Sequence, residues 1–335
     1  MRHLYGTPVR CVLDCNLLDP VKCTTMHGNR VPSMPAWILL IVAVAVSGCG
    51  YVDLFGLRTI PPALANVGHP VDIEVGQPFV DRQGRQLLFD LYRPVHADGP
   101  RPLVVVIFGD SWSKGSRDQL VEYAYDLAAN GYVAAAIDYR LVDEQTVFPS
   151  QVADVLAAIS FLRENADSYG IDADRVATFG ASAGALLALV AGLSDDVSQF
   201  DPDFPPGHSM GVRAVVNLFG PTDLTVGTSI APSQIRTVER FLGRRLDEAA
   251  DLWKAASPIT YVRADGPAVL TFHGDADSVV PVSHARALDQ AMSAVGQTHV
   301  LVEVPGMEHA VGGIWISPQA QAFRPVLFQF LEDHL

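Results

Sequence analysis

The chain has 335 residues, of which 49% are apolar and 18% charged, and its formal net charge at pH 7 is −14. This length and composition are sufficient for one large α/β domain with an extensive core. The acidic excess argues against nucleic acids and anionic lipid surfaces as partners, because both require a basic patch on the protein.

The N-terminal region contains all four cysteines, Cys11, Cys15, Cys23 and Cys49, and no Cys or His pair follows at zinc-finger spacing. We therefore expect no metal site. The apolar stretch 36–46 is too short for the roughly 20 residues of a membrane span and has the length of a signal-peptide core. It leads into Val46-Ser47-Gly48-Cys49, which resembles a bacterial lipobox with Cys49 as the lipid attachment site.

This pattern predicts a signal segment over residues 1–48, with translation starting at Met1 or Met26, followed by a Pro/Gly-punctuated tether over 49–70. The mature protein would then be extracytoplasmic, in the cell envelope, and would touch the membrane through its lipid anchor only. The alternative is a buried apolar segment that ends in an incidental cysteine.

One large α/β domain is predicted over residues 71–335. Two strand-like runs, 71–75 and 85–94, flank a Gly-containing turn and indicate an antiparallel start, after which strands and helices alternate. Continuous apolar runs such as LVVVIF and YVAAAI are typical of strands covered on both faces, so we expect a mainly parallel, twisted sheet with helices on both faces. Residues 221–262 are too long for a simple loop and are predicted to form a small cap insertion. The expected strands are 103–109, 132–139, 175–180, 213–220, 268–273 and 299–304, and the expected helices 117–130, 151–168, 182–193, 285–295 and 320–334.

Gly180-Ala181-Ser182-Ala183-Gly184 lies between a predicted strand and an Ala/Leu-rich helix. A G-x-S-x-G sequence in this context predicts a sharp turn from which the Ser182 hydroxyl projects at the helix N-terminus, where developing negative charge is favoured. A tight turn with an incidental serine is the alternative.

A serine nucleophile needs a base and an orienting carboxylate. Two later strands end in His273-Gly274-Asp275-Ala276-Asp277 and in a turn that reaches His309. The order Ser, Asp, His, each after a strand, is the order found in α/β-hydrolases. We favour Asp277 over Asp275 as the acid, because Asp275 directly follows Gly274 and is better placed to hold its loop by Asx-type bonds. His273 is expected to support the acid loop rather than to act as the base.

From about Gln86 to the C-terminus the chain resembles the bacterial carboxylesterase branch of the α/β-hydrolases that includes feruloyl-esterase-like and hormone-sensitive-lipase-like enzymes. The resemblance implies an α/β-hydrolase fold with Ser182 as nucleophile, Asp277 as acid and His309 as base. It rests on the stretches IDYRL (137–141), FPSQVADVLAAISFLRENADSYGIDADRVATFGASAGA (148–185), LFGPTDL (218–224), ASPITYV (256–262), HGDADSVVP (273–281) and GMEHA (306–310).

The chain departs from this family at the oxyanion loop, where Phe108-Gly109-Asp110-Ser111-Trp112 replaces the family's HGGGW. Because an oxyanion hole uses main-chain N–H groups, the loop can still function if its backbone keeps its path. The expected donors are Asp110 and Ser111 with Ala183, and the Asp110 carboxylate should face outward or pair with a base such as Lys114. A loop that has drifted from this path is the alternative. Trp112 is either a pocket wall or a structural residue.

The sequence thus predicts a serine carboxylic-ester hydrolase that forms an acyl-enzyme on small or medium esters and uses no metal or organic cofactor. Its only expected partner besides the membrane is a small-molecule ester. Two alternatives stay open: an amide- or peptide-cleaving hydrolase of the same fold, and a non-catalytic surface lipoprotein. The acyl preference and the oligomeric state do not follow from the sequence.

Overall fold

The computed structural model describes residues 9–12, 22–25, 68–82, 84–95, 98–225, 234–309 and 318–335. In the N-terminal region these include two short antiparallel strands, β1 (Val9–Val12) and β2 (Lys22–Thr25). Cys49 and nearly all of the predicted signal segment and tether lie outside the described residues, so those assignments stay predictions. No helix in the described ranges is long and apolar enough to cross a membrane.

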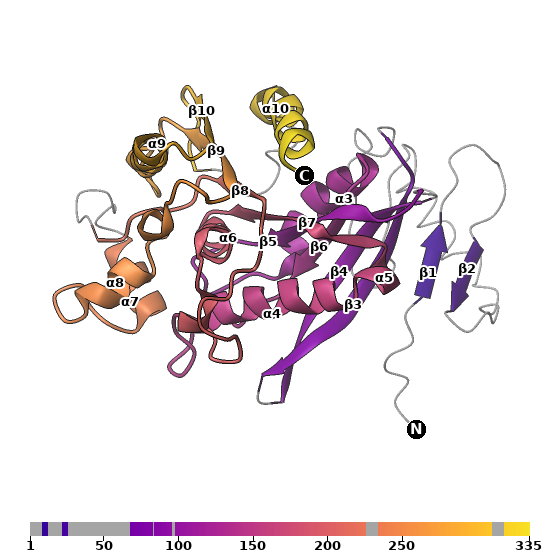
Figure 1. The fold of residues 1–335 in the computed structure, drawn as a ribbon, viewed down its shortest axis with the longest axis horizontal. Helices are drawn as coiled ribbons and strands as arrows, with labels where there is room; N and C mark the ends of the chain where they lie inside the picture. Colours follow the sequence, from indigo (N-terminus) through magenta and orange to yellow (C-terminus); the bar gives the residue numbers. More distant parts are fainter. Residues whose placement is uncertain are drawn as a thin grey trace, which may run out of the picture.

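The centre of the fold is an eight-stranded sheet in the order β10-β9-β8-β7-β5-β6-β4-β3 (Figure 1). The six strands from β10 to β6 are parallel, whereas β4 pairs antiparallel with both β6 and β3. The strand bounds are β3 Val71–Arg82, β4 Arg85–Pro94, β5 Arg101–Ile107, β6 Val133–Ile137, β7 Ile171–Ala181, β8 Ala214–Leu218, β9 Ala268–Gly274 and β10 His299–Val304.

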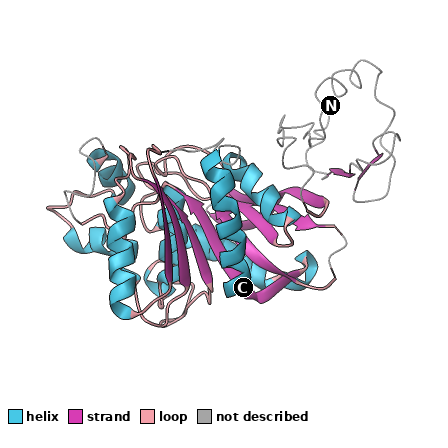
Figure 2. Ribbon diagram, turned by 90° about the horizontal axis from the view of Figure 1, so that it is seen from above, coloured by secondary structure: helices cyan, strands magenta, loops and turns pink. Residues whose placement is uncertain are grey.

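Helices cover both faces of this sheet (Figures 1 and 2). The central strands are buried on both sides, and residues 103–107 of β5 and 133–137 of β6 are entirely apolar and at most 1% exposed. The predicted α/β fold with a mainly parallel sheet is therefore confirmed. The helices are α3 Val121–Ala129, α4 Ser150–Glu164, α5 Ala166–Tyr169, α6 Ala183–Leu193, α7 Ile235–Leu242, α8 Ala250–Ala255, α9 Ser283–Val295 and α10 Pro318–His334, with 3₁₀ turns η1 Arg117–Leu120, η2 Val197–Gln199 and η3 Pro258–Tyr261.

Several expected elements have different bounds in the structure. The strand expected over 71–75 extends to Arg82, and the helix expected over 117–130 begins with the 3₁₀ turn η1. The helix predicted over 151–168 is divided into α4 and α5 at Asn165, whose side-chain amide donates to the Phe161 carbonyl and closes the end of α4. The strand predicted over 175–180 begins earlier, at Ile171, because this segment pairs with the start of β5. Residues 234–262 form α7, α8 and η3 within the segment predicted as a cap, and the division into domain and cap stays a prediction.

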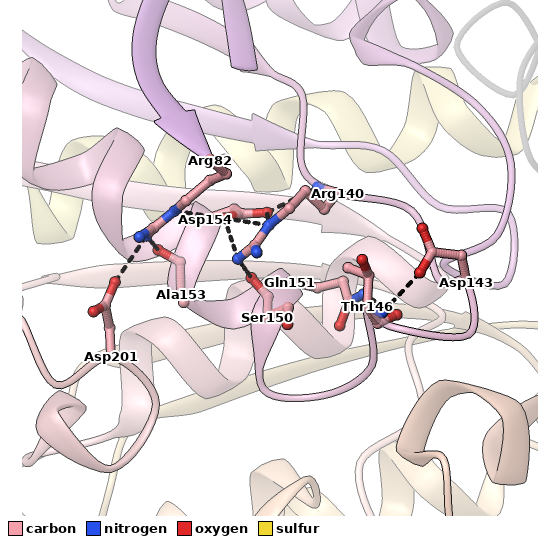
Figure 3. Close-up of polar contacts among 9 residues, drawn as sticks. All are labelled: Arg82, Arg140, Asp143, Thr146, Ser150, Gln151, Ala153, Asp154 and Asp201. Carbon is pink, nitrogen blue, oxygen red and sulfur yellow. Dashed lines mark hydrogen bonds and ion pairs between the residues drawn. The ribbon is translucent and has the colours of Figure 1, made fainter. Parts of the chain in front are cut away.

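An ion-pair network anchors the loop that leads from β6 into α4 (Figure 3). The fully buried Asp154 carboxylate accepts two guanidinium hydrogen bonds of 2.8 Å from Arg140 and one of 3.2 Å from Arg82. Arg82 also donates to Asp201 at 2.8 Å. The network joins the end of β3, the loop after β6, α4 and the segment after η2.

We predict that Asp154→Asn strongly destabilises the protein, because it leaves two largely buried guanidinium groups without their shared carboxylate. Breaking a buried ion pair by removing one partner costs about 3–5 kcal/mol. For a domain of this size that corresponds to a fall in Tm of roughly 10 °C, measurable by calorimetry. The matched control is Asp247→Asn, which removes the exposed partner of Arg245 and should change the free energy of unfolding by less than about 1 kcal/mol. Equal melting temperatures for the two variants would contradict the assignment.

Candidate active site

Ser182 is held in strained backbone geometry between β7 and α6, with φ 53° and ψ −120°. This turn is possible because glycines flank it. A Cβ on Gly180 would lie 2.3 Å from the Gly184 carbonyl oxygen, and one on Gly184 would lie 2.2 Å from the Phe108 carbonyl oxygen. Strand and helix therefore approach each other more closely than any other residues would allow, which aims the Ser182 side chain away from the sheet.

The structure brings the three predicted residues together in one hydrogen-bonded chain. Ser182 Oγ lies 2.9 Å from His309 Nε2, and His309 Nδ1 lies 2.7 Å from Asp277 Oδ2. The side chains come from the turns that follow β7, β9 and β10, which are parallel strands whose carboxyl ends meet at one edge of the sheet. The arrangement allows His309 to take a proton from the serine hydroxyl while the carboxylate orients its ring.

The Asp277 carboxylate is fully buried and has hydrogen-bond partners at both oxygens. Its Oδ1 accepts from the backbone N–H groups of Val279 and Val280 at 2.9 and 2.8 Å. Burial acts to raise the pKa of Asp277, but the hydrogen bonds from His273 and His309 and the charge of His309 outweigh it and hold the pKa well below its usual range. The carboxylate is therefore ionised at neutral pH.

The neighbouring residues Asp275 and His273 hold the loop that carries Asp277. Asp275 accepts a 2.6 Å hydrogen bond from the backbone N–H of Gly306 and so ties the turn after β9 to the turn after β10. His273 is fully buried, with Nε2 2.7 Å from the Val280 carbonyl oxygen and 3.4 Å from Asp277 Oδ2. Both residues thus contact the acid loop and neither contacts Ser182, as their sequence context indicates.

The loop after β5 has backbone angles typical of glycine, although most of the glycines of the family's HGGGW loop are replaced in this chain. Asp110, Ser111 and Trp112 have φ values of 71°, 58° and 57°, in the left-handed region that favours glycine. Gly109 is the position where a side chain cannot fit, since a Cβ would lie 2.6 Å from the Ala181 carbonyl oxygen. Among the described residues, no hydrogen bond engages the backbone N–H of Asp110, Ser111 or the first helical residue, Ala183.

A small cavity of about 50 Å³ adjoins Ser182. Its lining includes Ser111 and Trp112 but not Asp110, which is half-buried and forms no ion pair with the exposed Lys114. Trp112 combines both predicted roles: it lines the cavity, donates from Nε1 to the Ala183 carbonyl at 2.9 Å and stacks on Phe241 of α7. The full lining is Ser111, Trp112, Ser182, Ala183, Pro221, Leu224, Gln234, Thr237, Val238, Val279, Val280 and His284.

Sequence analysis missed two residues of the site. His284, in the first turn of α9, lines the cavity, and its Nδ1 accepts from the backbone N–H groups of Thr222 and Asp223. Phe219, directly after β8, packs its ring against His309. The LFGPTDL stretch that contains Phe219 was recognised, but no local pattern assigns its ring to His309. Within the described ranges, no group of three or more His, Cys, Asp or Glu residues is placed to hold a metal ion.

Comparisons with known proteins agree with this geometry. The BD-FAE family profile matches residues 89–292. Esterase LipC of Mycobacterium tuberculosis is 34% identical over 240 residues, which are 69% of this chain and 59% of LipC. Esterase LipQ of the same organism is 33% identical over 232 residues, 68% of this chain and 55% of LipQ. The chain thus matches little more than half the length of these curated relatives.

Solved structures give the same result for the fold. An esterase of Thermogutta terrifontis, Est2 with bound propionate, superposes with a TM-score of 0.66 at 26% identity and covers 77% of this chain and 93% of its own. A truncated carbohydrate esterase from gut microbiota superposes with a TM-score of 0.63 at 26% identity, covering 78% and 95%. This chain belongs to the BD-FAE family and has the α/β-hydrolase fold, as shown by its sequence match, its strand order and the position of Ser182 between β7 and α6.

Proposed function

We propose that the protein is a serine carboxylic-ester hydrolase that acts through an acyl-enzyme intermediate. The observation that carries the proposal is the chain of hydrogen bonds from Ser182 through His309 to Asp277, 2.9 and 2.7 Å long, beside a cavity. The names of the relatives support the same chemistry, since LipC and LipQ are esterases and LipM is named as a probable carboxylic ester hydrolase.

In the proposed reaction, Ser182 Oγ attacks the ester carbonyl carbon while His309 Nε2 accepts the hydroxyl proton. The imidazolium formed in this way is stabilised by the Asp277 carboxylate. When the tetrahedral intermediate collapses, His309 returns the proton to the leaving alcohol. Water then attacks the acyl-enzyme by the same route and regenerates the Ser182 hydroxyl.

The oxyanion of the tetrahedral intermediate needs two or three fixed N–H donors. Within the described residues, the backbone N–H groups of Asp110, Ser111 and Ala183 have no hydrogen-bond partner, and Gly109, directly before Asp110, packs against Ser182, so we assign them this role. Asp110 and Ser111 have φ values in the left-handed region that favours glycine. This conformation supports a working oxyanion hole over a drifted loop.

The cavity favours short acyl groups. Its volume of about 50 Å³ is well below the roughly 150 Å³ of an engineered protein cavity that binds benzene. Trp112, Leu224, Val238 and Val280 give it an apolar wall. Solved structures of the related Thermogutta terrifontis esterase contain propionate and butyrate. We therefore propose acyl chains of about two to four carbons.

Replacement of the nucleophile and acid tests this function. Ser182→Ala should lower kcat on p-nitrophenyl acetate by at least about 10³-fold, and Asp277→Asn by up to about 10⁴-fold, because the imidazole loses its correct tautomer. Both variants should melt as folded proteins. In the wild type, kcat/KM should fall for acyl chains longer than four carbons. If the amide-cleaving alternative is wrong, anilide analogues should react far more slowly than the corresponding esters.

The matched control for this series is Asp275→Asn, which alters the neighbouring carboxylate without touching His309. It should retain activity within about tenfold of wild type, a small loss beside that of Asp277→Asn. Retention of most activity by Ser182→Ala, or a greater loss in Asp275→Asn than in Asp277→Asn, would remove the proposed assignment. Absence of reaction with paraoxon, which phosphorylates the related Thermogutta esterase, would favour the binding-protein alternative.

The loop after β5 gives a second test. Asp110→Gly relieves a left-handed conformation that costs a non-glycine residue roughly 1–2 kcal/mol, so it should raise Tm while changing kcat less than about tenfold. Loss of a true oxyanion donor costs about 10² to 10³, and the Gly variant keeps the N–H. Ser111→Gly relieves the same strain but removes a side chain from the cavity wall. A gain of 10² or more in Asp110→Gly would mean that the native carboxylate opposes the oxyanion, contrary to the proposal.

We also propose that the protein is lipid-anchored outside the cytoplasm, on the sequence pattern that ends in Cys49. Expressed in a bacterium that is fed a clickable fatty acid, the wild type should be labelled and should sediment with membranes. Cys49→Ser should abolish both labelling and processing. A wild-type protein that stays unlabelled and uncleaved in the cytoplasm would contradict the lipobox assignment.

A further inference from the structure

Phe219 has an unusual conformation for a bulky residue. It directly follows β8 and has a positive φ of 44°, a genuine outlier for a large side chain, yet it is only 1% exposed. Strained residues of this kind persist where the surrounding structure fixes them, and they cluster at functional sites. A reason for the strain should therefore be visible in what the Phe219 side chain contacts.

The Phe219 ring contacts the proposed catalytic base. Its centroid lies 4.8 Å from that of the His309 imidazole, and the two ring planes are inclined by 71° in an edge-to-face arrangement. Hydrogen bonds to Ser182 and Asp277 already engage the two ring nitrogens of His309. Two such bonds fix a line through the imidazole but leave the ring free to tilt about it. The Phe219 contact supplies the third constraint.

The turn that carries Phe219 is held from several sides. The backbone N–H of Phe219 donates to the Phe272 carbonyl of β9 at 2.8 Å, and that of Gly220 donates to Asn217 Oδ1 at 2.9 Å. Asn217 donates in turn to Thr271 Oγ1 at 3.1 Å. A Cβ on Gly220 would lie 2.5 Å from the Ala185 side chain, so the turn also fits tightly against α6. These contacts prevent the strained residue from relaxing away from His309.

We propose that Phe219 is a positioning residue for ester hydrolysis, which fixes the tilt of the His309 ring by packing against it. This inference rests on the proposed function. A change at Phe219 removes this ring contact but leaves in place Ser182 and Asp277, which hydrogen-bond to His309, so its effect on the orientation of the imidazole can be measured separately.

The test compares Phe219→Leu with Phe89→Leu. Phe89 of β4 is also fully buried, and its aromatic neighbours are Phe79, Phe161 and Tyr169 rather than any residue of the site. For each protein, kcat and KM on p-nitrophenyl acetate are measured together with Tm. Phe219→Tyr, which keeps the aromatic face, is the conservative variant. Phe219→Met is the second non-aromatic variant should the Leu protein fail to fold.

We expect Phe219→Leu or Phe219→Met to lower kcat by about 10- to 100-fold, because the base is no longer held in its productive orientation. Because the tilt of His309 acts on the chemical step and not on substrate binding, kcat and kcat/KM should fall together while KM changes little. Phe89→Leu should lose stability without this loss of kcat, and Phe219→Tyr should restore most of the activity.

A kcat in the folded non-aromatic variants that equals that of Phe89→Leu would overturn the inference, as would a rise in KM at unchanged kcat or failure of Phe219→Tyr to restore kcat. The result is distinguishable from failure of the proposed function. If Ser182→Ala keeps its activity, the serine mechanism itself is wrong, whereas loss in Ser182→Ala with an unaffected Phe219→Leu rejects the role of Phe219 alone.

Discussion

The close approach of β7, α6 and the end of β5 is the constraint on which the site depends. Three glycines, Gly109, Gly180 and Gly184, occupy positions where a Cβ would lie 2.2 to 2.6 Å from a backbone oxygen of the neighbouring segment. The same contacts that force Ser182 into its strained turn bring the loop after β5 against it. Ser182, the proposed nucleophile, and the loop after β5 are therefore placed by one packing arrangement, and a side chain at any of the three glycines would separate them.

The remaining parts of the site are aligned by the parallel sheet. The turns after β7, β8, β9 and β10 emerge at one edge, and each contributes one residue: Ser182, Phe219, Asp277 and His309. The buried Asp277 carboxylate stays ionised because two histidines and two backbone N–H groups hydrogen-bond to it. In the proposed reaction, this charge would stabilise the His309 imidazolium without reorganisation of solvent.

Strained backbone occurs at two places beside the site, in the loop after β5 and at Phe219. Asp110, Ser111, Trp112 and Phe219 all have positive φ values although none is a glycine. At Trp112 and Phe219 the strain accompanies a ring placed against the site, on Phe241 and His309 respectively. At Ser111 it accompanies a side chain in the cavity wall. The free energy lost in the backbone is offset by the surrounding packing, as is common at functional sites.

The sequence by itself determined the α/β class and the mainly parallel sheet. It also placed Ser182, Asp277 and His309 in turns that follow strands, because hydrophobic periodicity and the turn after each strand are local properties. It also favoured Asp277 over Asp275 correctly for contact with His309, from the chain position of each relative to Gly274. Only the tertiary structure showed that Asp110 and Ser111 have φ angles in the region that favours glycine. It also showed that the cavity beside Ser182 is small and that Phe219 and His284 border the site. These features arise from contacts between segments far apart in the chain, such as Trp112 with Phe241 and Phe219 with His309, and no local pattern encodes such distances.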